Sequence, residues 1–260
     1  MSTISSKPST SSDACRPSWD DEQAGAVPTR ESTSVTDATF AVSSMSNSSE
    51  SGPWITGSPV ATNRVFSYIV AYDSGFAPNP FHGLLTLATC KPRIRQGAAV
   101  NDIVIGISSR SERIVYAMQV SQIIGFDEYW ADPRYAARRP QRDSPRIVNR
   151  TGDNIYEPSI SGYRQCPSFH SKDDGSEDLG HKARDTGVDR VLVSERFSYW
   201  GGSGPRLPEQ LSFLQIGIGH RVNFSPEQIA EVGGWFADQP GGVLGAPAMW
   251  KKNDDSWRQP

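Results

Sequence analysis

The stretch DSGFAPNPFHGLLTLATCKPRIR, residues 73–95, joins two apolar runs through a loop rich in glycine and proline. Pro78 and Pro80 fix their own φ angles and remove two amide donors from the loop. Gly75 can adopt a positive φ, and Asn79 can close an Asx turn. The sequence therefore predicts a stiff, irregular loop, which would present a constant surface to a ligand.

Strand-like segments lie on both sides of this loop. Residues 65–72 are aromatic and β-branched, and residues 84–90 form the apolar run that follows the loop. Alternating apolar residues predict further strands over 102–108 and 113–120, joined by a polar hairpin. Because no long helical pattern separates these strands, we expect a mainly antiparallel sheet or a small barrel.

The second half of the chain predicts a polar excursion, one more strand and helices. Residues 144–189 are rich in Gly, Pro, Asp and Ser and indicate an extended excursion, whereas residues 188–194 indicate a strand. A short helix is expected around residues 128–137, and the clearest helix follows Ser225 as N-cap, with Pro226 at its first position. The predicted fold class is α+β, a small, mainly antiparallel barrel with peripheral helices.

The N-terminal segment differs in composition from the rest of the chain. It is rich in Ser and Thr and poor in large apolar residues, so it cannot bury enough surface to offset its ordering entropy. We predict a disordered tail over residues 1–60 and one domain over residues 61–260. The formal net charge of the 260 residues is −3, which excludes a generally polycationic binder and allows local basic patches.

Composition also predicts an intracellular protein, cytoplasmic or nuclear, with no membrane partner. No apolar run approaches the roughly 20 residues that a membrane-spanning helix needs, and acidic residues near the N-terminus disfavour a transit peptide. Cys15, Cys90 and Cys166 are too few for a disulfide framework and fit a reducing compartment. The oligomeric state stays open.

The loop quoted first is the leading candidate for ligand binding. Phe76 and Phe81 would offer aromatic faces for stacking. Asp73, Asn79 and His82 would offer hydrogen bonds, and together these groups suit a planar heterocycle such as a base. The alternative is a structural connection whose aromatic residues cover the end of a barrel.

Three cations follow Cys90 at alternate positions. In an extended segment, Lys91, Arg93 and Arg95 would lie on one face and contact phosphates. The same cations would lower the pKa of the Cys90 thiol, which is how reactive thiols arise. A single cysteine at the end of an apolar strand is, however, more often a small buried hydrophobe.

A second basic region interleaves arginines with aromatic residues, as nucleic-acid surfaces often do. It contains Arg134, Arg138, Arg139, Arg142, Arg146 and Arg150, together with Tyr129, Trp130 and Tyr135. The alternative is a solvated face that pairs with acids of the same chain, namely Asp173, Asp174, Glu177, Asp178 and Asp185. Both interpretations stay open.

Patterns for metals, cofactors and known nucleophiles are weak. Cys166 and His170 are spaced as metal ligands could be, with His181 beyond them, but no CxxC pair accompanies them. The chain has no G-x-S-x-G, no G-x-x-x-x-G-K-[ST] and no G-x-G-x-x-G, and its GGSG indicates a turn after Tyr199 and Trp200. We predict no metal and no cofactor, and the motifs identify no reaction.

Several segments together resemble the nucleotide-modification-associated domain family, in the second group to carry that name. They are AYDSGFAPNPFHGLLTLATCKPRIR, NDIVIGISS, RIVYAMQV, FDEYWADPRY, GDNIY and DTGVDRVLVSERFSYWGGSGP, all between residues 65 and 250. This family is similar to PUA-like modules of the ASCH and EVE types, in which a small barrel holds a nucleobase in a pocket. The resemblance implies a link to modified bases.

The resemblance further implies recognition of nucleic acid or of a modified nucleobase, with a nucleic acid or nucleotide as partner. The loop after the first strand would wall the pocket, and the cations after Cys90 would hold phosphates. The expected ligand-contacting residues are Asp73, Gly75, Phe76, Asn79, Phe81, His82, Cys90, Lys91, Arg93, Arg95, Tyr199 and Trp200.

Two other functions stay open at this point. The first is an enzyme that acts on a nucleotide or a modified base, with Asp73, His82, Cys90 or the pair Asp185 and Asp189 as acid, base or nucleophile. The second is a protein-interaction adaptor that uses the long polar excursion.

Overall fold

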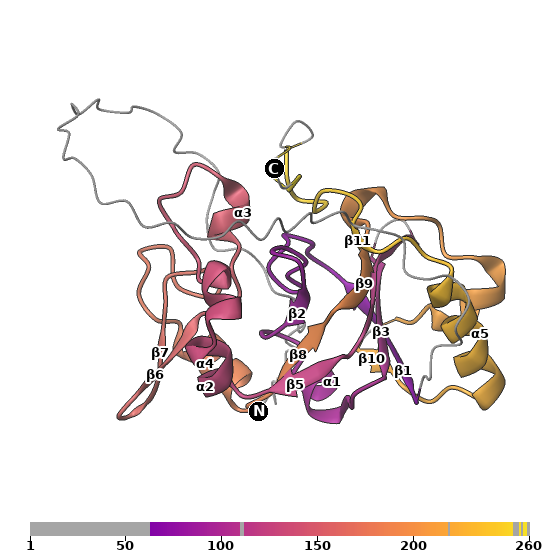
Figure 1. Cartoon of the computed structure of the whole chain (residues 1–260), viewed down its shortest axis with the longest axis horizontal. Coiled ribbons are helices and arrows are strands. Elements are labelled where there is room, and N and C mark those ends of the chain that lie inside the picture. Colours follow the sequence, from indigo (N-terminus) through magenta and orange to yellow (C-terminus); the bar gives the residue numbers. More distant parts are fainter. Residues whose placement is uncertain (1–62, 110–111, 218, 252–254, 256, 259–260) are drawn as a thin grey trace, which may run out of the picture.

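The computed structural model describes residues 63–109, 112–217, 219–251, 255, 257 and 258. The predicted tail over residues 1–60 lies outside these residues, and the division of the chain into tail and domain stays a prediction. A six-stranded sheet forms the centre of the domain (Figure 1). Its strands are β1 (Val65–Val70), β3 (Ile103–Ser108), β4 (Ile114–Gln119), β9 (Arg196–Tyr199), β10 (His220–Arg221) and β11 (Gly242–Val243).

The central sheet is open and mixed. Its strand order is β10-β1-β3-β4-β9-β11, and β1 pairs in parallel with β3, whereas β3 and β9 both pair antiparallel with β4. The predicted closed barrel is wrong, because β10 and β11 are opposite edges of this sheet and do not pair with each other. Alternation along each strand predicted the strands, but it carries no information on whether the outer edges meet.

Two smaller sheets complete the fold, and β6 and β7 lie at the edge of the domain away from the central sheet (Figure 1). β2 (Leu85–Leu87), β8 (Val191–Ser194) and β5 (Gln122–Ile124) form a three-stranded antiparallel sheet in that order, and β6 (Tyr156–Ser159) pairs with β7 (Gly162–Gln165). The strand predicted over 84–90 is shorter than expected, because the backbone turns at Cys90 and Lys91. The predicted polar excursion contains β6 and β7.

Helices surround these sheets. They are α1 (Pro92–Gly97), α2 (Phe126–Ala131), α3 (Ile147–Arg150), α4 (Leu179–Thr186) and α5 (Pro226–Ala237), with 3-10 turns η1 (Pro133–Arg138), η2 (Gly201–Ser203) and η3 (Glu209–Leu214). The predicted capping box of α5 is confirmed, since Ser225 and Gln228 bond to each other's backbone. Pro133 divides the helix predicted over 128–137 into α2 and η1. Among the residues that the structure covers, no helix has the length and apolarity to cross a membrane.

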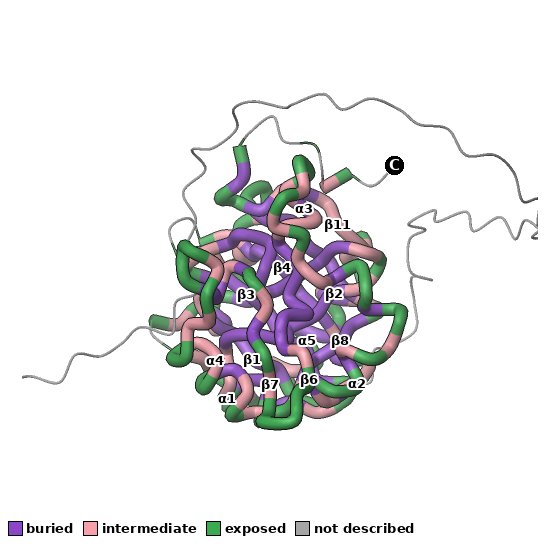
Figure 2. Tube along the Cα trace, turned by 90° about the vertical axis from the view of Figure 1, so that its left-hand side faces the viewer, coloured by how far each residue is buried: buried purple, intermediate pink, exposed green. Residues whose placement is uncertain are grey.

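The central sheet is covered on both faces, so its strands are almost continuously buried (Figure 2). On one face, Val232 and Phe236 of α5 pack with Leu211 and Leu214 of η3. The other face packs against Ile94 of α1 and against the second sheet. Figure 1 shows α5 and the second sheet on opposite sides of the central strands.

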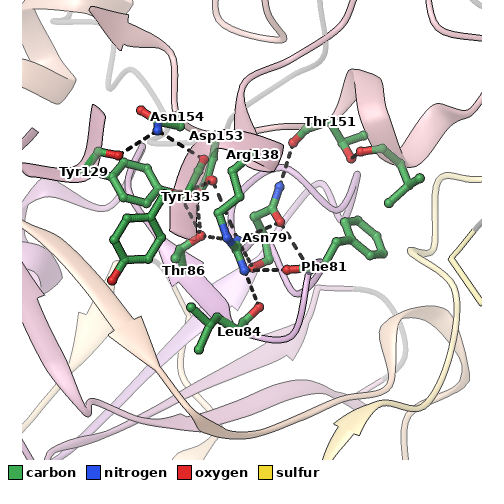
Figure 3. Close-up of polar contacts among 11 residues, drawn as sticks. Asn79, Phe81, Leu84, Thr86, Tyr129, Tyr135, Arg138, Thr151, Asp153 and Asn154 are labelled. Atoms are coloured by element: carbon green, nitrogen blue, oxygen red, sulfur yellow. Dashed lines mark hydrogen bonds and ion pairs between the residues drawn. The ribbon is translucent and has the colours of Figure 1, made fainter. Parts of the chain in front are cut away.

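The loop after β1 is held in place by the guanidinium of Arg138, which is fully buried (Figure 3). Nη1 donates to Asn79 Oδ1 at 3.0 Å and to Thr86 Oγ1 at 2.8 Å. Nη2 donates to the carbonyl oxygens of Phe81 and Leu84. One side chain thus satisfies backbone groups that the irregular loop cannot pair with itself.

Asp153 is the buried counter-charge of Arg138, 4.0 Å away, and is also completely buried. Its carboxylate accepts hydrogen bonds from Thr86 Oγ1 at 2.6 Å and Tyr129 OH at 2.7 Å. Burial raises the pKa of Asp153 above its usual range, and the charge of Arg138 limits that rise. The network therefore depends on both charges being present.

We expect Arg138→Met to lower the free energy of unfolding by about 3–5 kcal/mol, because it leaves Asp153 buried without its counter-charge. Urea unfolding followed by circular dichroism measures this loss. Arg134→Met is the matched control, since Arg134 lies in the same 3-10 turn and pairs with Asp132 at the surface. Similar losses in the two variants would contradict the structural role given to Arg138.

Candidate active site

The two phenylalanines of the loop face the protein interior. Phe81 stacks on Trp250 with ring centroids 5.3 Å apart, and Phe76 packs edge-to-face on His170 at 4.9 Å. Their exposed fractions are 0% and 1%. The prediction that both rings are exposed for stacking is therefore wrong, because these rings are needed to fill the space under the loop.

The three cations after Cys90 do not form a stripe. Residues 92–97 are the helix α1 instead of an extended segment, so alternate residues do not share a face. Arg93 is exposed, whereas Arg95 is fully buried and Lys91 Nζ lies 4.8 Å from the centroid of the Tyr68 ring. The predicted one-sided phosphate-contacting surface is wrong.

Arg95 instead fixes the backbone around Cys90. Its guanidinium donates to the carbonyl oxygens of Cys90 at 2.9 Å, Asp185 at 2.7 Å, Val188 at 2.6 Å and Arg190 at 2.9 Å. These acceptors belong to two separate stretches of the chain, the turn at Cys90 and residues 185–190. Arg95 therefore holds Cys90 and Asp185 at a constant separation.

Cys90 lies on a sharp turn between the strand β2 and the helix α1. Its φ is 57° and that of Lys91 is 40°, so two consecutive residues other than glycine adopt the left-handed conformation. Such residues cost about 1–3 kcal/mol each and gather at functional sites. A strand, a strained turn and a helix also present the nucleophile in α/β-hydrolases.

The side chain of Cys90 meets His170 and Asp185 in a continuous row. Cys90 Sγ lies 3.2 Å from His170 Nε2, and His170 Nδ1 lies 2.7 Å from Asp185 Oδ2. Because a carboxylate only accepts hydrogen bonds, Nδ1 carries the proton, and Nε2 is turned to the sulfur. This is the arrangement of nucleophile, base and orienting carboxylate found in covalent catalysis.

Asp185 is held from several sides, so its orientation is well defined. Its Oδ1 accepts from the Cys90 backbone amide at 2.8 Å, and its Oδ2 accepts from Tyr156 OH at 2.8 Å. Burial opposes ionisation of Asp185, yet its pKa is lowered, because His170, Arg95 and Tyr156 stabilise the carboxylate. An ionised Asp185 is the form that orients the imidazole.

The two cysteines of the described domain are in different states. Cys90 is disulfide-bonded in this structure, whereas Cys166 is free. Burial raises the pKa of the Cys166 thiol above its usual value. The number of cysteines had not led us to expect this disulfide. A reductant is needed to release the Cys90 thiol.

A second feature is a hollow of about 260 Å³ at the carboxyl ends of β1 and β3. Asp73 lies in its wall, where it accepts hydrogen bonds from Tyr199 OH and, at 2.8 Å, from the Ala248 amide. Burial raises the pKa of Asp73 to about 6. The hollow is lined by Val70, Ala71, Tyr72, Asp73, Ser108, Ser109, Arg113, Val115, Gly201, Gly202, Ala248 and Met249.

The other residues expected to contact a ligand have structural surroundings. Gly75 has φ 77°, and a Cβ there would meet Pro247 and Phe81, so the predicted positive φ is confirmed. Asn79 belongs to the Arg138 network, and Trp200 packs on Trp235 in the core. The pKa of His82 is lowered to about 4 by burial and by the charges of nearby arginines. Their contact with a ligand stays a prediction.

The second basic region does not form one surface. Arg138 is buried, Arg139 lies over the Trp130 ring at 4.2 Å, and Arg142 donates to the Asp173 carbonyl at 2.5 Å. Neither a nucleic-acid surface nor a solvated face paired with acidic residues therefore describes the whole region. In the part of the chain that the structure covers, no three His, Cys, Asp or Glu side chains are placed to hold a metal ion.

The structure is a mixed α/β domain in which Cys90, His170 and Asp185 form a buried row of contacts, called the triad below. The chain belongs to the nucleotide modification associated domain 2 family, whose model matches residues 62–254. The resemblance found in the sequence is thus confirmed, and the family name links the chain to nucleotide modification. The wider PUA-like relationship stays a prediction. No curated protein and no solved structure matched the chain.

Sequence patterns singled out Cys90 and Asp185 of the triad and did not connect them with His170. Cys90 and Asp185 were candidates for an enzyme site, but His170 was considered only as a metal ligand. The available signal was a histidine inside a long polar excursion, since ordered excursions often carry function. The pairing itself was out of reach, because His170 lies 80 residues from Cys90 and 15 from Asp185.

We expect His170→Ala to slow the alkylation of reduced Cys90 by iodoacetamide about tenfold near pH 6.5, because the imidazole beside the sulfur would stabilise the thiolate. The comparison is made on Cys90 itself, since this residue is only 3% exposed and Cys166 is more accessible. Peptide mass spectrometry of the reduced full chain measures both rates. His170→Ala should slow only Cys90. An unchanged Cys90 rate in His170→Ala would contradict the triad.

Proposed function

We propose that this protein is an enzyme that acts on a nucleotide or a modified base through covalent catalysis by Cys90. The observation that carries this proposal is the row of contacts from Cys90 Sγ to His170 Nε2 at 3.2 Å and from His170 Nδ1 to Asp185 Oδ2 at 2.7 Å. The family name supports the choice of substrate class.

In the first half of the reaction, the Cys90 thiol gives its proton to His170 Nε2, and Asp185 stabilises the imidazolium. The thiolate attacks an electrophilic carbon of the substrate, and a carbon–sulfur bond forms. The bond from that carbon to the leaving group breaks, and the leaving group takes the proton from His170 Nε2. The substrate fragment is then attached to Cys90.

In the second half, water or another acceptor attacks the same carbon. The acceptor loses a proton to an imidazole, the carbon–sulfur bond breaks, and the electron pair returns to the sulfur. The thiolate is regenerated beside His170. This sequence needs no oxidant or reductant within the cycle, but Cys90 must first be released from its disulfide.

The proposal is tested with the reduced full chain and a panel of nucleotides and nucleosides, natural and base-modified, with products separated by liquid chromatography and mass spectrometry. We expect turnover of at least one compound, and a fall of about 10³-fold or more in Cys90→Ala, as triad variants show. Cys166→Ala is the matched control and should keep full turnover. Equal turnover in Cys90→Ala and the unsubstituted chain would rule out the mechanism.

A second candidate function is recognition of a nucleobase, and the hollow beside Asp73 favours it. Small-molecule sites are concave and mainly apolar with a few convergent polar groups, at volumes of roughly 300–1,000 Å³. The hollow is slightly smaller, at about 260 Å³, and combines Val70, Val115 and Met249 with the Asp73 carboxylate. A base edge with N–H donors would suit that carboxylate.

If Asp73 accepts hydrogen bonds from a base, affinity for nucleosides should rise as pH increases from about 5 to about 7. The pKa of Asp73 is raised to about 6, so the carboxyl is neutral below that pH and an ionised acceptor above it. Isothermal titration calorimetry with adenosine and guanosine measures this change. Asp73→Asn should remove the pH dependence.

A filled hollow gives a separate check, since Asp73→Asn also alters the bonds to Tyr199 and Ala248. Ser109 is exposed and lines the hollow, so Ser109→Leu should occupy the space without disturbing the core. We expect it to abolish nucleoside binding at every pH. Unchanged binding in Ser109→Leu would exclude the hollow as the recognition site.

A further inference from the structure

A second imidazole lies against the triad. The ring centroids of His170 and His181 are 4.3 Å apart, and the rings are tilted by 52°. His181 and Asp185 are four residues apart on α4, so both lie on the same face of that helix. Because the Asp185 side chain contacts His170, the His181 side chain on the same face of α4 also lies against His170.

The backbone of His181 is fixed, whereas its ring has unused hydrogen-bonding capacity. Asp178 caps α4 by accepting from the His181 amide at 2.9 Å. His181 Nδ1 is buried and has no hydrogen-bond partner within the structure's described ranges. An unpaired imidazole nitrogen can accept a proton, and this one belongs to the ring that contacts His170.

The charge state of His181 also suits a proton acceptor. Its pKa is lowered, mainly by burial and then by the charge of His170. Two imidazoles in contact do not readily carry two positive charges. A lowered pKa favours the neutral form of His181, which is the form that can accept a proton.

We propose that His181 is the base that deprotonates the second reactant, which releases the substrate fragment from Cys90. This inference rests on the proposed enzymatic function. Water gives a proton to His181 Nδ1 and its oxygen bonds to the substrate carbon, while the carbon–sulfur bond breaks and the electron pair returns to Cys90. The proton then passes from His181 to His170, which restores the thiolate–imidazolium pair.

The test uses p-nitrophenyl acetate as a generic acyl probe with the reduced full chain, in a stopped-flow spectrophotometer. The burst of p-nitrophenol reports acylation of Cys90, and the steady rate that follows reports deacylation. In His181→Gln we expect a burst of unchanged size and a steady rate at least about tenfold lower. Hydroxylamine, which attacks without a base, should restore the steady rate.

Arg184→Gln is the matched control, because Arg184 is an exposed residue of the same helix, and it should leave both phases unchanged. His170→Ala should lose the burst, which separates the two histidines. A steady rate that His181→Gln does not change would overturn the assignment, and so would loss of its burst. If the unsubstituted chain shows no burst that depends on Cys90, this inference fails, whereas the proposed function is decided separately by turnover of the nucleotide panel.

Discussion

The burial of two guanidinium groups is the constraint on which the irregular parts of this domain depend. The loop after β1 and the turn at Cys90 expose backbone carbonyls that no strand or helix pairs, and buried carbonyls need donors. Arg138 supplies donors to the first and Arg95 to the second. Arg138 also lies 4.0 Å from the buried carboxylate of Asp153, and Arg95 donates to the backbone carbonyl of Asp185. Their charges are therefore part of the scaffold that places Cys90, and are not available to a nucleic acid.

Much of the central sheet could be predicted because each strand carries its own signal. The alternation in residues 102–108 and 113–120 became β3 and β4, and the cap at Ser225 became the start of α5. The closed barrel could not be tested in that way, since closure depends on whether distant edges such as β10 and β11 meet. The burial of Arg95 and Phe81 could not be predicted either, because a sequence pattern does not show which polar or aromatic side chains will be buried in the core.

The candidate site required long-range information of another kind. Cys90 comes from a turn after β2, His170 from a turn in the polar excursion and Asp185 from α4. Each residue type alone is common, and only their distances make them a triad. The family name links the chain to nucleotide modification, whereas the geometry of the three residues is a separate observation that names no substrate. The hollow beside Asp73 adds a place where a base could be held.

The parallel pairing of β1 with β3 has a consequence for the order of folding. The loop after β1, Cys90 and Arg95 all lie in the crossover between these two neighbouring strands. Closing such a crossover costs chain entropy that is recovered only when the parallel pair forms, so non-local pairing of this type is slow. His170 and Asp185 lie still further along the chain. A ribosome must therefore release most of the domain before Cys90 and His170 can come into contact.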